Sequence, residues 1–129
     1  MENKNENKKK VLIIDDDENL LLVLTDKLTI EGFDVIRAKN GQEGLDKALK
    51  THPDLILLDV IMPIMNGLDM LKELRKDEWG KKAKVIMLTV IEDADSVADA
   101  VTDGSFTYLI KTDLNADEIV KNIKEAIDK

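Results

Sequence analysis

The chain has 129 residues, no cysteine, 3% aromatic residues and a formal net charge of -8 at pH 7. This length suits one domain, and the lack of cysteine excludes disulfides, thiolate metal sites and cysteine nucleophiles. The acidity argues against direct binding of nucleic acid, and no apolar run approaches the roughly 18 residues of a membrane span, so we expect a cytoplasmic protein that does not enter a membrane.

The first ten residues, MENKNENKKK, have no apolar side chain after the initial methionine. Such a polar segment cannot bury enough surface to fold by itself. We therefore expect a disordered tail over residues 1–10 and one folded domain over residues 11–129. The tail carries a net charge of +2, so the expected domain carries -10.

From Val11 onward, apolar runs of strand length alternate with segments of helical period. The expected strands are 11–15, 33–38, 54–59, 84–89 and 106–110, and the expected helices lie near 18–31, 41–51, 67–77, 93–103 and 115–128. This alternation is typical of a parallel sheet with crossover helices. It predicts an α/β, doubly wound, five-stranded parallel sheet in the order 2-1-3-4-5, the flavodoxin-like (βα)5 arrangement.

Three acidic or amide side chains occupy positions that suit helix N-caps. Asp17 precedes the first expected helix, Asn40 precedes the second with Glu43 three residues later, and Asn115 stands in the same relation to Glu118. These spacings predict that the side chains satisfy backbone N–H groups at the helix starts. Capping is therefore the reading we prefer for Asp17.

Polar side chains also follow four of the expected strands: Asp15 and Asp16 the first, Asp59 the third, Thr89 the fourth and Lys111 the fifth. The carboxyl ends of parallel strands meet at one edge, where this fold binds its ligands. Carboxylates brought together repel one another, and a hard divalent cation such as Mg²⁺ neutralises such a cluster. Taken singly, Thr89 also fits strand propensity, and Lys111 also fits an ordinary surface lysine. The prediction therefore depends on these polar side chains meeting at one edge of the sheet.

Four motifs in this order, IIDDD, LLDVIMPIMNG, LT and YLIK, give the chain its resemblance to a response regulator receiver domain of the CheY-like superfamily. The resemblance extends from the first expected strand to the last helix. It implies a single-domain receiver of a two-component system that accepts a phosphoryl group on Asp59. It also implies Mg²⁺ held by Asp16, Asp59 and the Ile61 carbonyl, with Asp15 bound through water.

For the other matching positions, the resemblance implies that Thr89 and Lys111 stabilise the phosphoryl group and that Thr89 and Tyr108 form a switch. The phosphoryl donor would be a histidine kinase or a histidine phosphotransfer protein. A downstream protein would bind the surface formed by residues 93–103, 106–110 and 115–128. Such a protein is not an enzyme in the ordinary sense, because it catalyses only its own phosphorylation and dephosphorylation.

The sequence departs from the family pattern near the site. Thr112 follows Lys111 where proline is usual, and a cis bond before a non-proline residue costs about 3 kcal/mol, so we expect a trans bond there. Val90 replaces a smaller residue. Ile61 and Ile91, two positions after Asp59 and Thr89, bring no polar group that could orient a hydrolytic water, which favours slow loss of the phosphoryl group.

Two other functions stay open on sequence grounds. A phosphatase of the haloacid dehalogenase type would use Asp15 as nucleophile in the pattern Asp15-x-Asp17, although Asn19 stands where threonine or valine is usual. A receiver-like binding module would never be phosphorylated. The residue that carries an acyl phosphate distinguishes the first alternative, and the absence of any adduct on Asp59 would indicate the second.

Overall fold

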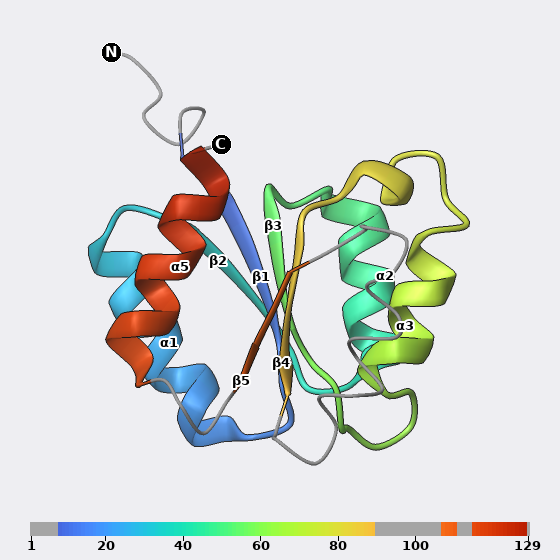
Figure 1. The fold of residues 1–129 in the computed structure, drawn as a ribbon, viewed down its shortest axis with the longest axis horizontal. Helices are drawn as coiled ribbons and strands as arrows, with labels where there is room; N and C mark the ends of the chain where they lie inside the picture. The colour runs from blue at the N-terminus through green and yellow to red at the C-terminus, as the bar shows by residue number, and fades with distance from the viewer. Residues whose placement is uncertain (1–7, 90–106, 111–114, 129) are drawn as a thin grey trace.

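The computed structural model describes residues 8–89, 107–110 and 115–128. Within them, five parallel strands form one sheet in the order β2-β1-β3-β4-β5 (Figure 1). The strands are β1 (Lys10–Ile14), β2 (Asp34–Ala38), β3 (Leu55–Asp59), β4 (Val85–Thr89) and β5 (Thr107–Ile110). The predicted fold class and strand order are confirmed, and each strand boundary lies within one residue of its prediction.

Helices cover both faces of this sheet. The helix α1 (Glu18–Ile30) and the helix α5 (Ala116–Asp128) lie on one face, and α2 (Gly41–Thr51) and α3 (Gly67–Leu74) lie on the other (Figure 1). The helix predicted at 93–103 lies outside the described residues. None of the helices in the described part of the chain is long and apolar enough to cross a membrane.

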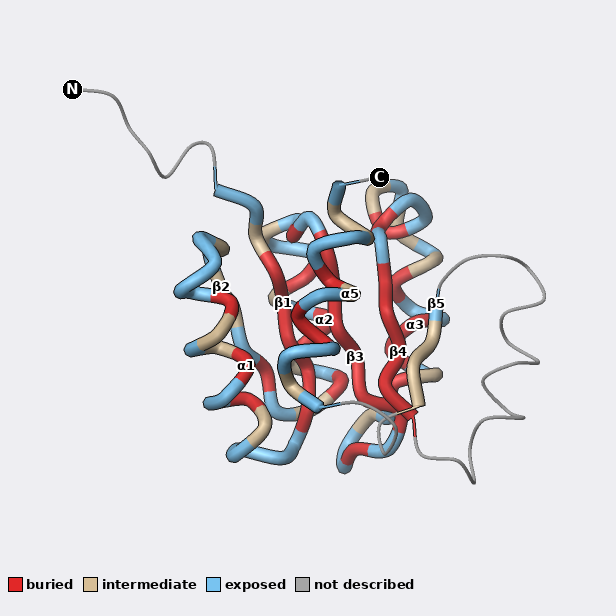
Figure 2. The backbone as a smooth tube through the Cα atoms, turned by 60° about the vertical axis from the view of Figure 1, so that its left-hand side comes forward, coloured by how far each residue is buried: buried red, intermediate tan, exposed pale blue. Residues whose placement is uncertain are grey.

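Every residue of the central strands β3 and β4 is buried, as the red tube in Figure 2 shows. Successive side chains of a strand point to opposite faces, and β1 follows this rule. Leu12 and Ile14 join the apolar cluster beneath α2 and α3, whereas Val11 and Ile13 join the cluster beneath α1 and α5. A continuous apolar run is therefore needed at β1, because both of its faces are covered.

The helix α3 is shorter than predicted, ending at Leu74 instead of residue 77. The chain folds back on the helix end, and the Arg75 guanidinium holds it there by donating to the carbonyl oxygens of Gly80 at 2.6 Å and Ala83 at 2.8 Å. Residues 80–82 then form a short 3₁₀ helix, η2 (Gly80–Lys82). The turn depends on contacts with residues that follow it, which helical periodicity does not reveal.

The predicted N-caps are confirmed. Asp17 accepts two backbone N–H bonds in the first turn of α1. Asn40 accepts the Glu43 N–H at 2.8 Å, and Asn115 and Glu118 exchange side chain to backbone bonds at 2.9 and 3.0 Å. Each bond satisfies a helix N–H that has no partner within its own helix.

Glu43 gives a test of how much the start of α2 contributes to stability. Its carboxylate accepts the Lys39 backbone N–H at 2.7 Å and pairs with Lys47 at 3.2 Å. The backbone hydrogen bond, with the Lys47 charge, lowers the pKa of Glu43 below its usual 4.5. A lowered pKa in the folded state means that this contribution is present above pH 4.5 and is lost as the pH falls through the folded value.

We therefore expect Glu43→Gln to lower the free energy of unfolding at pH 7 by less than about 1 kcal/mol, because the side chain is 40% exposed and solvent screens its charge. Urea unfolding of both proteins at pH 7 and in acid measures the difference. The difference should shrink in acid, once the wild-type carboxylate is protonated. A difference that grows on acidification would contradict the assigned role.

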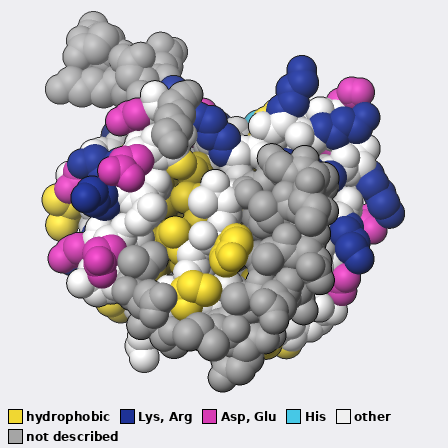
Figure 3. Space-filling model, in the orientation of Figure 1, with side chains coloured by type: hydrophobic (Ala, Val, Ile, Leu, Met, Phe, Trp, Pro, Cys, Tyr) yellow, Lys and Arg dark blue, Asp and Glu magenta, His cyan; other side chains and the backbone are white. Residues whose placement is uncertain are grey.

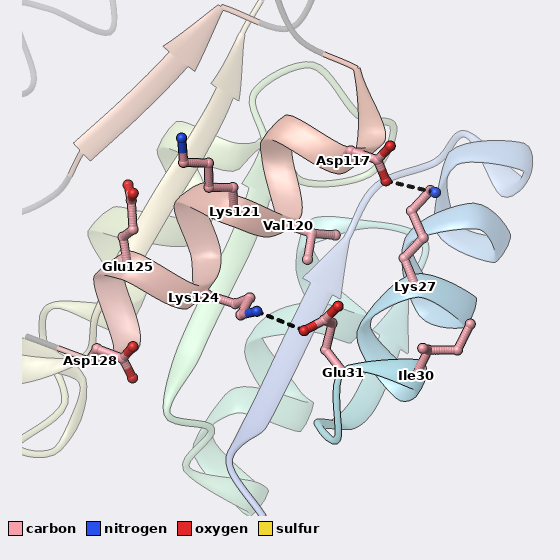
Figure 4. Close-up of a pocket in the computed structure, with 9 residues that line it drawn as sticks. All are labelled: Lys27, Ile30, Glu31, Asp117, Val120, Lys121, Lys124, Glu125 and Asp128. Carbon is pink, nitrogen blue, oxygen red and sulfur yellow. Dashed lines mark hydrogen bonds and ion pairs between the residues drawn. The ribbon is translucent and has the colours of Figure 1, made fainter.

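Two ion pairs join α1 and its C-cap residue Glu31 to α5 beside a groove of about 520 Å³ (Figure 4). Lys27 pairs with Asp117 at 2.8 Å, and Lys124 pairs with Glu31 at 2.7 Å. Acidic and basic side chains are interspersed over these two helices (Figure 3). None of the residues predicted to hold the cation or the phosphoryl group lines this groove.

Candidate functional site

Two buried aspartates stand side by side at the carboxyl edge of the sheet. Ile14 of β1 pairs with Leu58 of β3 in the parallel register, so Asp15 and Asp59, the next residue of each segment, come level with one another. The Asp15 N–H extends the pairing by donating to the Ala38 carbonyl at 3.1 Å. Asp15 is fully buried, and Asp59 is only 6% exposed.

A third carboxylate completes an acidic cluster. Asp16 is exposed. Asp15, Asp16 and Asp59 each offer one carboxylate oxygen, and these three oxygens lie within 4.8 Å of one another. The Asp17 N–H donates to Asp15 Oδ1 at 2.9 Å, which fixes one oxygen of the buried carboxylate. Asp17 itself turns away to cap α1. The three consecutive aspartates of this segment thus divide between the cluster, which takes Asp15 and Asp16, and the cap, which takes Asp17.

The donor set of this cluster suits a hard divalent cation. All three groups are carboxylates, and two of them are buried in a setting where their charges would otherwise oppose one another. Mg²⁺ prefers oxygen ligands and is usually held by one or two carboxylates together with waters and phosphate oxygens. Asp16, at the exposed side of the cluster, leaves access for such waters and for a phosphoryl group.

The loop after β3 is held by backbone hydrogen bonds. Val60 donates its N–H to the Leu88 carbonyl at 3.0 Å, and Gly67 donates to the Val60 carbonyl at 2.8 Å, which closes the loop on itself. Asn66 then caps α3. Ile61, whose carbonyl is a predicted ligand, is 60% exposed.

The remaining predicted site residues lie on β4, on β5 or after β5. Thr89 ends β4 and is buried at the same edge of the sheet as Asp59. Tyr108 lies on β5 opposite Met87 and packs, partly buried, against the core cluster of the α2 and α3 face. Lys111, with the bond that joins it to Thr112, lies outside the described residues.

Two backbone features near the site were not predicted. Ile64, in the loop after β3, has a φ of 72°, and Gly41 at the start of α2 donates its N–H to the Met65 carbonyl in that loop at 3.0 Å. The segment Pro63 to Gly67 does carry the composition of a turn. Composition does not reveal which residue takes the left-handed conformation, nor that α2 touches this loop.

Comparison with known proteins places the chain in a family. The family model described as "Response regulator receiver domain" matches residues 11–124. The chain is 40% identical over 94 residues to the transcriptional regulatory protein LnrK of Bacillus subtilis, an alignment that covers 72% of the chain and 41% of LnrK. It thus spans less than half the length of that relative. The chemotaxis protein CheY of the same organism is 29% identical over 108 residues, covering 83% of the chain and 88% of CheY.

Solved structures agree with these matches. The response regulator protein TrrA of Thermotoga maritima, solved in complex with Mg²⁺ and BeF, is 33% identical and superposes with a TM-score of 0.76. That superposition covers 92% of the chain and 98% of TrrA. Together with the strand order and the acidic cluster at the carboxyl edge, these matches lead to one assignment. The chain belongs to the response regulator receiver domain family.

Proposed function

We propose that the chain accepts a phosphoryl group on Asp59 in a Mg²⁺-dependent reaction and thereby switches a protein-binding surface. The observation that carries this proposal is the position of Asp59. It is a buried carboxylate at the end of a central strand, and its oxygens lie close to those of two further aspartates. A carboxylate in such a place is a competent nucleophile toward phosphorus once the surrounding negative charge is offset.

In the proposed reaction, a carboxylate oxygen of Asp59 attacks the phosphorus of a phosphohistidine on the donor protein. A new oxygen–phosphorus bond forms, the nitrogen–phosphorus bond breaks, and its electron pair returns to the donor imidazole. Asp16, Asp59 and the Ile61 carbonyl would hold Mg²⁺ directly, and Asp15 would hold it through water. When bound, the cation offsets the negative charge of the acids and of the phosphoryl oxygens.

Two further residues are proposed to stabilise the transferred group. The Thr89 hydroxyl would donate a hydrogen bond to one phosphoryl oxygen, and the Lys111 ammonium would pair with another. Support for Thr89 comes from its burial at the end of β4, beside the strand that ends in Asp59. For Lys111, the support is its place in the sequence directly after β5.

We propose a histidine kinase or a histidine phosphotransfer protein as the donor and a downstream protein as the target, in the cytoplasm and without direct contact to nucleic acid or a membrane. The target would bind the surface of residues 93–103, β5 and α5. Movement of Thr89 toward the phosphoryl group would let Tyr108 turn inward and shift the surface between two states. Tyr108 is partly buried on β5, which supports this role.

A small phosphodonor tests the proposal without knowledge of the kinase. Wild-type protein is incubated with acetyl phosphate or with beryllofluoride, with and without Mg²⁺, and the adduct is measured by mass spectrometry or by fluorine NMR respectively. We expect an adduct that forms only with the cation. No adduct under either condition would instead favour the receiver-like module that is never phosphorylated.

The phosphoryl group should be lost slowly from the purified protein. Ile61, two residues after Asp59, is exposed, and its side chain offers no hydrogen bond to a hydrolytic water. Since a polar side chain at this position could orient that water, we expect Ile61→Gln to speed the loss several-fold. The decay of the labelled protein after removal of the donor measures both rates, and faster decay in the wild type than in Ile61→Gln would contradict this expectation.

A further inference from the structure

The loop that follows Asp59 contains a strained turn. Ile64 adopts a φ of 72°, a conformation that β-branched residues rarely take. The Met65 N–H donates to the Pro63 carbonyl at 2.8 Å and closes a three-residue turn around it. A non-glycine residue in this region is strained and persists only where its surroundings hold it there. The Ile64 side chain is 81% exposed, so its own burial does not offset that strain.

A contact from outside the loop holds this turn. Gly41, the first residue of α2, donates its N–H to the Met65 carbonyl at 3.0 Å. An N–H group in the first turn of a helix has no partner within the helix, and here the loop supplies one. Met65 also packs, partly buried, against the core of the α2 and α3 face. The helix α2 and the loop are therefore joined next to the strained residue.

Only glycine permits this approach. A Cβ atom at residue 41 would lie 2.2 Å from the Met65 carbonyl oxygen and 2.9 Å from its carbon. Both are backbone atoms, so no side-chain rotation could relieve the overlap. Any other residue at position 41 would have to push the loop away from α2.

The loop is fixed at its other end as well. Gly67 donates to the Val60 carbonyl at 2.8 Å, and a Cβ atom at Gly67 would lie 2.2 Å from the Asp59 carbonyl oxygen. Between these two anchors lies Ile61, whose carbonyl would be a ligand. With both anchors in place the loop has little freedom, whereas loss of the Gly41 anchor would let the strain at Ile64 relax by moving the loop.

We propose that Gly41 is a positioning residue for the metal site, acting through its contact with Met65. The contact holds residues 60–66 in the shape that presents the Ile61 carbonyl beside the Asp59 carboxylate. This inference rests on the proposed function, since it assumes that the acidic cluster binds Mg²⁺. It adds that cation affinity depends on a helix that contributes no ligand.

The test compares two alanine variants of the same kind. In Gly41→Ala the new Cβ meets the Met65 carbonyl, whereas in Gly80→Ala it meets the Leu74 carbonyl at 1.9 Å, near the start of β4 and so at the opposite edge of the sheet from the acids. Both changes should destabilise the fold. We expect only Gly41→Ala to weaken Mg²⁺ binding, raising the dissociation constant about 10-fold, as the loss of a support around a metal site typically does.

Isothermal titration with Mg²⁺ measures the constants, and thermal unfolding without the cation measures the cost to the fold. Equal constants for Gly41→Ala and the wild type would overturn the inference while leaving the proposed function intact. Equal weakening of Mg²⁺ binding in both variants would also overturn the inference and leave the proposed function intact. A wild type that does not bind Mg²⁺ would overturn both the inference and the proposed function.

Amide hydrogen exchange of the wild type covers the case in which Gly41→Ala does not fold. If α2 and the loop are coupled, saturation with Mg²⁺ should slow exchange of the Gly41 N–H more than that of the Gly80 N–H, which donates to Asp77 at 2.9 Å. Equal slowing at the two amides, or none at Gly41, would contradict the proposal.

Discussion

Asp59→Asn is expected to abolish labelling by acetyl phosphate completely. The amide has nearly the shape of the carboxylate but lacks its nucleophilic charge, so the fold should survive while the acceptor is lost. Asp59 is 6% exposed at the end of a strand whose other residues are all buried, and a substitution of similar shape avoids a cavity. Mass spectrometry after incubation with donor and Mg²⁺ measures the label, and circular dichroism checks the fold.

The same experiment addresses the phosphatase alternative. If Asp15 were the nucleophile, Asp59→Asn would keep the label, because the Asp15 carboxylate would be intact. Asp15 is buried, and its Oδ1 accepts a hydrogen bond from the Asp17 N–H. Both observations are consistent with the role proposed for Asp15, which is to hold Mg²⁺ through water. Label that persists at the wild-type level in Asp59→Asn would therefore refute the assignment of the acceptor.

The second large effect is expected at Asp16. We expect Asp16→Ala to raise the dissociation constant for Mg²⁺ about 100-fold. Loss of a residue that only supports a metal ligand typically weakens metal binding about 10- to 100-fold, and loss of a direct ligand should cost at least the upper end of that range. Asp17→Ala is the matched control. It removes an acid one residue away whose side chain accepts two N–H bonds at the start of α1. That variant should lose about 1 kcal/mol of stability and keep the wild-type affinity.

Urea unfolding with and without Mg²⁺, together with calorimetric titration, separates the two roles. The wild type should gain about 2.7 kcal/mol at a cation concentration 100 times the dissociation constant. Asp17→Ala should show the same gain from a lower starting point, and Asp16→Ala should gain only about 0.4 kcal/mol at that concentration. The reverse pattern, with weak binding in Asp17→Ala alone, would contradict the assignment of Asp16 to the metal site and of Asp17 to the cap.

The arrangement of the sheet could be predicted because it follows from local patterns. The continuous apolar runs of β1 and β3 are compatible only with strands covered on both faces, and right-handed crossovers leave few orders for five such units. The register then brings Asp15 level with Asp59, which is why the acidic cluster could be predicted from residues more than forty positions apart. The caps at Asp17 and Asn40 depend on spacing alone.

What could not be predicted depends on contacts between distant segments. The end of α3 at Leu74 follows from bonds that Arg75 makes to residues beyond the turn. The role inferred for Gly41 depends on where the Met65 carbonyl lies, and the conformation of Ile64 runs against the preference of its own side chain. The positions of Lys111 and of the helix predicted at 93–103 remain predictions, because both lie outside the described residues.

The most direct test of the central claim is to locate the acyl phosphate itself. Wild-type protein is phosphorylated with acetyl phosphate and Mg²⁺, and the acyl phosphate is reduced with borohydride, which converts the modified aspartate to homoserine. Peptide mass spectrometry then identifies the altered residue. We predict that the change lies at Asp59 alone and requires Mg²⁺. Modification at Asp15, or at Asp59 to the same extent without the cation, would contradict this account.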